Sequence, residues 1–219
     1  MPLKLVILGA SGGCGRHLVQ QAAAAGHRVV AVGRATSSLD DVPDGVTVAR
    51  GDVDDVDFLA TTFEGADVVL SGLGIRMSGI APWATAEDIT LMSRAGPAIA
   101  EAVDQAGVPR VLAITAGGVG SSWDIMPFFF KALIKMSALR VAYNDLEGFE
   151  AGFAGCSAQV MFARPTGLTD EAATGKTVVA TRLVGNSQIP RADVAAWVLE
   201  HLEGELPELG PVITVTGAG

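Results

Sequence analysis

The sequence predicts an α/β fold in which a doubly wound parallel sheet carries helices on both faces. Short apolar runs of about five residues alternate with longer segments of helical periodicity along most of the chain. Neighbouring parallel strands need crossover connections, which the helical segments supply. No linker, internal repeat or low-complexity segment interrupts residues 1–219. We therefore predict a single domain.

The first strand is predicted at residues 3–8, an apolar run that ends in glycine, as expected for a strand buried on both faces. A helix over 13–25 follows, with apolar residues at helical spacing and Gly26 as its C-cap. Similar apolar runs predict strands at 28–32, 46–49, 67–70, 111–115, 158–162 and 212–215. Further helices are predicted at 54–65, 87–106, 137–152 and 191–203.

The charge balance argues against a nucleic-acid partner. The formal net charge is −9, whereas binding to a phosphate backbone needs clustered cations. No apolar stretch reaches the roughly 18 residues of a membrane span, and the first residues enter a strand pattern that leaves no room for a signal peptide. The 2 cysteines are too few for a disulfide framework. We expect a cytoplasmic protein without a metal site.

Three glycines, Gly9, Gly12 and Gly15, lie between the first strand and the first helix, spaced as G-x-x-G-x-x-G. In a dinucleotide-binding turn the first glycine permits the tight bend, the second lets the backbone approach a diphosphate, and the third allows close packing of helix and strand. The N–H groups and dipole of the helix then favour phosphate. We predict that a nicotinamide dinucleotide binds this loop through Gly9, Ser11, Gly12, Gly13, Cys14 and Gly15.

Two alternatives concern the same loop. Residues 9–13 also match G-x-S-x-G, the nucleophile elbow of hydrolases, but that motif follows several strands and needs a histidine on a loop, which the chain does not offer. Cys14 stands at the start of a helix, where a thiol pKa can be lowered. The other interpretation is that Cys14 is a small side chain that fills the turn.

The end of the second strand predicts a preference for NADP(H) over NAD(H). An acid at this position would bind the ribose 2′-OH, but the chain has Arg34, and the nearest acid is Asp40. Arg34 can pair with a 2′-phosphate, with Ser37 or Ser38 as further donors; the alternative is a solvated surface arginine. Next to the adenosine and diphosphate we expect Asp52, Val53, Ser71, Gly72, Leu73 and Gly74.

Several short segments along the chain form a recognisable set. They are the glycine loop and the segments 33–34, 51–53, 65–69, 115–120, 163–169 and 191–195. With these segments the chain resembles, over nearly its whole length, the atypical short-chain dehydrogenase/reductases, specifically the group that includes flavin/biliverdin reductases and NmrA-like regulators. The resemblance implies a seven-stranded parallel sheet with strand order 3-2-1-4-5-6-7.

The Tyr-x-x-x-Lys pair that serves acid–base catalysis in many relatives of this superfamily is absent. The only tyrosine, Tyr143, is followed four residues later by Glu147, and a carboxylate would raise the pKa of the phenol. We expect Tyr143 to pack or to form a hydrogen bond rather than to act as an acid. Hydride transfer stays feasible, because the cofactor supplies the hydride and the protein mainly orients two rings.

Thr115, at the end of the fifth strand, is the best candidate for contact with the substrate or the carboxamide; the alternative is a helix cap or turn residue. Ala116 and Gly117 would let a flat ligand approach the backbone. Arg164 and Pro165, which end the sixth strand, are expected beside the cofactor. Asp145 and Glu150 are assigned structural roles.

The substrate region is predicted in segments 75–86, 116–136 and 164–190. An unusual apolar passage, 122–130, contains three consecutive phenylalanines that cannot all face one core. We interpret it as a wall of an apolar pocket. A homodimer contact and a lipid-facing surface are alternatives, because Lys131 and Lys135 flank the passage. The predicted pocket residues are Met77, Trp83, Trp123, Phe128, Phe129 and Leu168.

The function predicted from these features is an NADPH-dependent reductase that acts on a planar or apolar small molecule, such as a flavin, quinone or tetrapyrrole. A non-catalytic NADP(H)-binding redox sensor is the main alternative. An isomerase or dehydratase is a third, although such enzymes normally carry the tyrosine–lysine pair and a larger substrate domain. The sequence names neither the acceptor nor the oligomeric state.

Overall fold

A computed structural model of the chain describes residues 1–75, 77–79, 81, 83–85, 87–181, 187–207 and 212–215. Parts of the predicted substrate segments 75–86 and 164–190 therefore lie outside the described residues. None of the described helices is long and apolar enough to cross a membrane.

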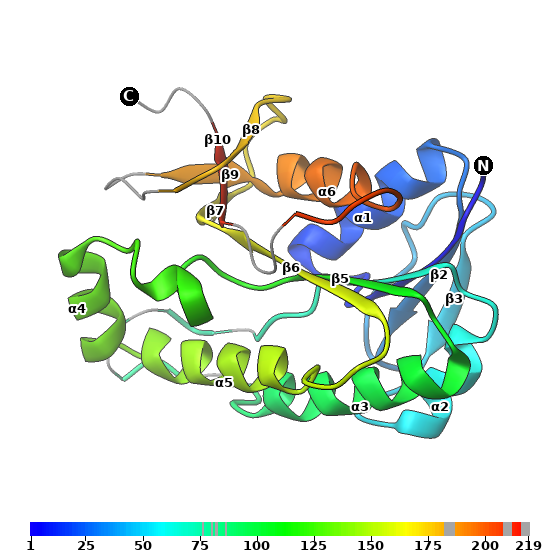
Figure 1. The fold of residues 1–219 in the computed structure, drawn as a ribbon, viewed down its shortest axis with the longest axis horizontal. Coiled ribbons are helices and arrows are strands. Elements are labelled where there is room, and N and C mark those ends of the chain that lie inside the picture. Colours follow the sequence, from blue (N-terminus) through cyan, green and yellow to red (C-terminus); the bar gives the residue numbers. More distant parts are fainter. Residues whose placement is uncertain are drawn as a thin grey trace.

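The central sheet has 8 strands in the order β3-β2-β1-β4-β5-β6-β10-β8 (Figure 1). All pairings are parallel except that of β8 with β10. The strands are β1 (Lys4–Leu8), β2 (Arg28–Gly33), β3 (Thr47–Arg50), β4 (Val68–Ser71), β5 (Arg110–Ile114), β6 (Gln159–Pro165), β8 (Thr177–Val179) and β10 (Val212–Val215). A separate parallel pair consists of β7 (Gly167–Thr169) and β9 (Gln188–Pro190).

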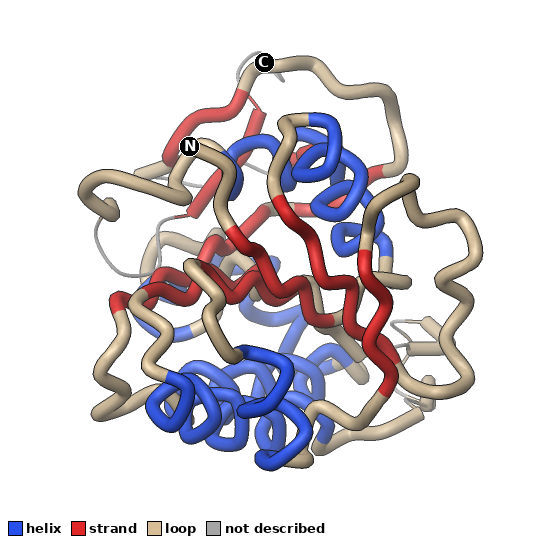
Figure 2. Tube along the Cα trace, turned by 90° about the vertical axis from the view of Figure 1, so that its right-hand side faces the viewer, coloured by secondary structure: helices blue, strands red, loops and turns tan. Residues whose placement is uncertain are grey.

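Helices cover both faces of this sheet, which confirms the doubly wound fold (Figure 2). The helices are α1 (Gly13–Ala24), α2 (Val56–Phe63), α3 (Leu91–Ala106), the 3-10 turn η1 (Gly120–Trp123), α4 (Phe128–Met136), α5 (Leu139–Ala151) and α6 (Arg191–Leu199). The predicted strand order agrees through β10. The antiparallel eighth strand, β8, was not predicted, because three residues are too short for a periodic signal. Segment 120–136, which shows no regular sequence pattern, forms η1 and α4.

The central strand β1 shows why the strands of this sheet are continuous apolar runs in the sequence. Leu5, Val6, Ile7 and Leu8 are all fully buried. Successive strand residues point to opposite faces, so Leu5 and Ile7 join the core beneath α1 and α6, whereas Val6 and Leu8 join the core beneath α2, α3 and α5. Both faces of the strand are therefore apolar.

Helix α5, which carries several polar residues of interest, packs closely against α3. A Cβ at Gly148 would lie 2.6 Å from the Cβ of Ser93, so only glycine permits this approach. The close packing places the buried carboxylate of Asp145 at the start of α3, where it accepts hydrogen bonds from the N–H groups of Met92 and Ser93, each at 2.9 Å. These N–H groups have no partner within their own helix. Asp145 thus acts as a cap supplied by a neighbouring helix.

Candidate functional site

The glycine loop has a backbone shape that other residues would disturb. Gly9 has φ +68, in the left-handed region, and its carbonyl accepts a hydrogen bond from the N–H of Gly12 at 2.9 Å. A Cβ at Gly15 would collide with the Gly9 carbonyl oxygen. Gly12 is the N-cap of α1 and has no side chain to cap the helix. The first N–H groups of α1 consequently lie at a glycine-rich bend, a geometry suited to phosphate.

Cys14 fills the turn and is not a reactive thiol. It is buried among the core residues beneath α1 and α6. Burial raises the pKa of its thiol to about 11, although the nearby Arg191 acts in the opposite direction. Its burial supports the other interpretation, in which Cys14 is a small side chain that fills the turn.

A cleft at the carboxyl ends of β1, β2 and β4 brings together many of the residues predicted to bind the adenosine half of a cofactor. Arg34 lies on this cleft, and its guanidinium is 3.8 Å from the carboxylate of Glu87. Among the predicted residues that do not line it, Asp52 is exposed, and Ser71 is fully buried and accepts a hydrogen bond from the N–H of Leu73. Gly13, Cys14 and Gly15 of the glycine loop do not line it either. The other predicted residues on the cleft are Gly9, Ser11, Gly12, Val53, Gly72, Leu73 and Gly74.

Arg50, at the end of β3, is a residue that the sequence analysis missed. Its guanidinium donates hydrogen bonds to the carbonyl oxygens of Arg34, Ala35 and Ser37 at 3.2, 3.4 and 2.9 Å. Arg50 therefore fixes the loop that follows β2 and adds a second positive charge beside Arg34. The sequence feature that could have identified Arg50 is its position as a basic residue at the end of β3, the strand that pairs with β2.

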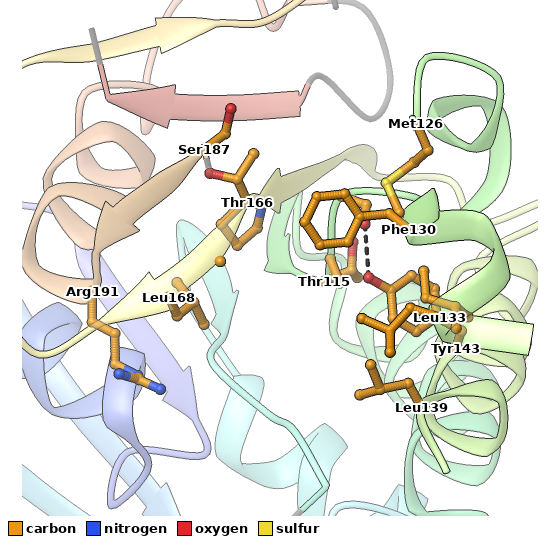
Figure 3. Close-up of a pocket in the computed structure, with 15 residues that line it drawn as sticks. Thr115, Met126, Phe130, Leu133, Leu139, Tyr143, Thr166, Leu168, Ser187 and Arg191 are labelled. Carbon is orange, nitrogen blue, oxygen red and sulfur yellow. Dashed lines mark hydrogen bonds between the residues drawn. The ribbon is translucent and has the colours of Figure 1, made fainter. Parts of the chain in front are cut away.

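A second cavity, of about 560 Å³, lies at the carboxyl ends of β5 and β6. Figure 3 shows Phe130 and Tyr143 on one side of it and Leu168 and Arg191 on the other. Its floor follows from strand pairing, because the N–H of Thr115 donates to the carbonyl of Ala163 and the N–H of Gly117 to that of Pro165, each at 2.8 Å. The predicted site residues that line this cavity are Thr115, Ala116, Gly117, Tyr143, Pro165 and Leu168.

Most of the predicted aromatic pocket residues are not found on this cavity. Phe128 and Phe129 are 85% and 56% exposed, and Trp83 is 83% exposed. Trp123 lines a different, shallower cavity beside Lys135. Phe130 and Leu133 of α4 line the larger cavity instead, together with Met126. Met77 is described but does not line it. The helical turn of α4, which the sequence analysis did not anticipate, decides which phenylalanine faces inward.

Tyr143 donates a hydrogen bond from its hydroxyl to the carbonyl oxygen of Gly117 at 2.9 Å (Figure 3). Burial raises the pKa of its phenol. The phenol therefore stays neutral near pH 7 and is held in place as a hydrogen-bonding residue, in agreement with the expected structural role. The predicted cause was different, because the shift comes from burial rather than from Glu147.

Thr115 is joined to a buried ion pair behind the cavity. Its hydroxyl donates to a carboxylate oxygen of Glu150 at 2.8 Å. Arg164, only 4% exposed, contacts both oxygens of the same carboxylate, at 3.1 and 2.5 Å, and reaches Ser121 at 2.9 Å. The guanidinium of Arg164 is thus directed toward the carboxylate of Glu150 and not into the cavity. The next residue, Pro165, lines the cavity.

Arg191, at the start of α6, lies between the glycine loop and the larger cavity. Its Nε atom is 2.6 Å from where a Cβ of Gly13 would stand, and it donates to the carboxylate of Asp170 at 2.8 Å. A guanidinium in this position can pair with a phosphate on the loop. In the sequence, Arg191 belongs to segment 191–195, which contributes to the family resemblance, and no role at the site was predicted for it. Its proximity to the loop results from the packing of α6 beside α1 (Figure 1).

A family model described as NAD(P)H-binding matches residues 9–205. The chain belongs to this NAD(P)H-binding family. The match spans both the glycine loop and the late Arg-Ala-Asp segment that begins α6. A search of curated proteins finds no match.

Several solved structures share the fold. The chain is similar to ChuY, described as an anaerobilin reductase from Escherichia coli O157:H7, with a TM-score of 0.78, 25% identity, and coverage of 99% of this chain and 98% of ChuY. It is also similar to the oxidoreductase YlbE from Lactococcus lactis (TM-score 0.76, 18% identity, coverage of 97% and 91%). A third similar structure is a short-chain dehydrogenase/reductase from Veillonella parvula, with a TM-score of 0.75, 16% identity, and coverage of 99% of this chain and 96% of that one. The last two show the fold alone.

Proposed function

We propose that this NAD(P)H-binding protein is an NADPH-dependent reductase that passes a hydride to a planar, largely apolar small molecule. The carrying observation is the cavity at the ends of β5 and β6, which adjoins the glycine loop through Arg191 and is walled by Met126, Phe130 and Leu133. Ligands of doubly wound sheets bind outside the carboxyl ends of the strands. A cavity of about 560 Å³ is of the size that holds one small ligand.

The cations at the ends of β2 and β3 support the preference for NADPH. Arg34 lies on the adenosine cleft, and Arg50 holds the adjoining loop through three carbonyl oxygens. Both residues are exposed, and arginine pairs well with a 2′-phosphate. The carboxylate of Glu87 favours the opposite preference, but two cations outnumber it.

The cofactor, when bound, supplies the hydride, and the protein supplies position. Ala116 and Gly117 leave the floor of the cavity free of large side chains, so two flat rings can stack there. Tyr143 stays protonated and bonded to the Gly117 carbonyl, so the proton that completes the reduction comes from solvent. The similarity to ChuY, an anaerobilin reductase, supports an acceptor of this planar class.

A non-catalytic redox sensor is the second candidate. It is favoured by the same observation on Tyr143, because no tyrosine–lysine pair is positioned to donate a proton. Such a protein would bind NADP(H) and report its oxidation state without turnover.

One assay separates the two candidates. The protein is mixed with NADPH and a panel of flavins, quinones and biliverdin, and the nicotinamide absorbance is followed. We expect oxidation of NADPH with at least one acceptor. Tight NADPH binding without oxidation across the panel would instead favour the sensor.

The cofactor preference has its own test. The variant Arg34→Asp replaces the cation with a carboxylate that can bind a ribose 2′-OH, so we expect NADPH affinity to fall by about tenfold to a hundredfold while NADH affinity is retained or improved. Equal affinity of the wild-type protein for NADPH and NADH would contradict the assignment.

A further inference from the structure

Two of the side-chain hydroxyls that line the larger cavity, those of Thr115 and Tyr143, already donate their protons to neighbouring groups. Figure 3 shows the hydrogen bond of Tyr143. A hydroxyl has one proton to donate and two lone pairs that accept. Where the proton is taken by a neighbour that can only accept, the hydroxyl can act toward a ligand only as an acceptor. The neighbours of these two residues therefore decide what kind of ligand atom the floor recognises.

The partner of Thr115 is the carboxylate of Glu150, which accepts but does not donate when it is ionised. The guanidinium of Arg164 donates hydrogen bonds to both oxygens of this carboxylate, and both side chains are at most 10% exposed. An exchange of roles, in which Glu150 would donate to Thr115, would require a protonated carboxyl beside a buried guanidinium. The ion pair opposes that state. The hydroxyl proton of Thr115 therefore stays in the hydrogen bond to Glu150.

The partner of Tyr143 is the backbone carbonyl of Gly117, which also accepts only. The geometry is fixed from both sides, since α5 carries Tyr143 and the strand pairing of Gly117 with Pro165 holds the carbonyl. The phenol oxygen is left with its lone pairs. The backbone N–H groups of Thr115 and Gly117 are likewise occupied, by the carbonyls of Ala163 and Pro165.

We propose that Thr115 and Tyr143 recognise N–H groups of the planar acceptor. The two hydroxyls would then accept hydrogen bonds from the ligand, which is the opposite of a site in which hydroxyls donate to a substrate carbonyl. Beside these two residues the cavity should then prefer ring systems that carry an N–H, such as a flavin or a pyrrole-type ligand, over quinones, which offer only carbonyl oxygens. The inference rests on the proposed function and narrows its acceptor. It also makes Glu150 a positioning residue that sets the direction of the Thr115 hydroxyl.

The test measures binding of three probes to the protein saturated with NADP⁺, so that no turnover is needed. The probes are lumiflavin, its N3-methyl derivative, which lacks the ring N–H, and menadione, a quinone. We expect lumiflavin to bind about threefold to tenfold more tightly than N3-methyl-lumiflavin, the effect of one neutral hydrogen bond. Menadione should bind more weakly than lumiflavin.

Variants assign the effect to the two hydroxyls. Thr115→Val and Tyr143→Phe should reduce lumiflavin affinity and shrink the difference between lumiflavin and its N3-methyl derivative, whereas Thr115→Ser should preserve both. Glu150→Gln provides an amide N–H that can donate to Thr115 and release its proton toward the cavity. The relative affinity for menadione should then rise, a shift that a merely structural role of Glu150 would not produce.

Equal binding of lumiflavin and N3-methyl-lumiflavin overturns the inference, as does tighter binding of menadione or the absence of binding by both flavins. The proposed function fails on a different result, namely no oxidation of NADPH with any acceptor. Rapid NADPH oxidation by menadione with no discrimination for N–H groups would keep the reductase and remove only the recognition proposed for Thr115 and Tyr143.

Discussion

Glu87 lies 3.8 Å from Arg34 on the adenosine cleft, and both side chains are more than half exposed. A 2′-phosphate that pairs with Arg34 must compete with this carboxylate. Glu87→Gln should therefore raise NADPH affinity by about twofold to fivefold, the range of an exposed ion pair, and leave NADH affinity unchanged. Fluorescence titration at low and high salt measures the effect, which should shrink with salt. An equal gain for both cofactors would show that Glu87 does not face the 2′ position.

The glycine loop gives a matched pair of substitutions. Gly15→Ala places a Cβ against the carbonyl oxygen of Gly9, so the loop must open; Gly74, on the same cleft, has nothing within 4 Å of a Cβ. We expect Gly15→Ala to lower the free energy of unfolding by about 1–3 kcal/mol and to reduce cofactor affinity at least tenfold. Gly74→Ala should leave the free energy of unfolding near the wild-type value, because the added Cβ meets no protein atom. Calorimetry and thermal unfolding test the pair, and normal NADPH binding by Gly15→Ala would contradict the role of the loop.

Two of the three consecutive phenylalanines at the start of helix α4 differ in their surroundings. Phe130 lines the larger cavity, whereas Phe128 is 85% exposed. Phe130→Ser should raise the KM for a planar acceptor by about tenfold or more, because a cavity wall is lost, while Phe128→Ser should leave KM near the wild-type value. Steady-state kinetics with both variants gives the comparison. An unchanged KM in Phe130→Ser, with a large effect in Phe128→Ser, would move the acceptor site to the outer face of α4.

Asp193 predicts a pH-dependent contribution to stability. Burial alone would raise the pKa of this carboxyl, but hydrogen bonds from Thr174 and Gly175 together lower it. A lowered pKa in the folded state means stability that is present above the unfolded pKa of about 4 and is lost as the pH falls through the folded value. Asp193→Asn should therefore cost about 1–3 kcal/mol at pH 7, with a smaller difference from wild type below about pH 4. Urea unfolding across this range tests the sign; a difference that grows toward acid would refute it.

Most of the fold could be predicted from local patterns, because the strands of a doubly wound sheet are buried on both faces. The run Leu5–Leu8 is apolar at every position for this reason, and the glycine loop is recognisable because Gly9, Gly12 and Gly15 are needed by the backbone itself. The short strand β8 and the helix α4 were not predicted; β8 has only three residues and is defined by its pairing with β10.

By itself the sequence determined the alternation of strands and helices, the glycine loop and the absence of a tyrosine–lysine pair. These features depend on residue types at short spacing, which the chain encodes locally, whereas the strand order through β10 was implied by the family resemblance. Only the tertiary structure decided that Glu150 takes the proton of Thr115, that Arg191 covers Gly13, and that Phe130 rather than Phe128 faces the cavity. Each of these contacts joins segments that are far apart in the chain or depends on a helix rotation, and such relationships are set by packing and leave no periodic trace in the sequence.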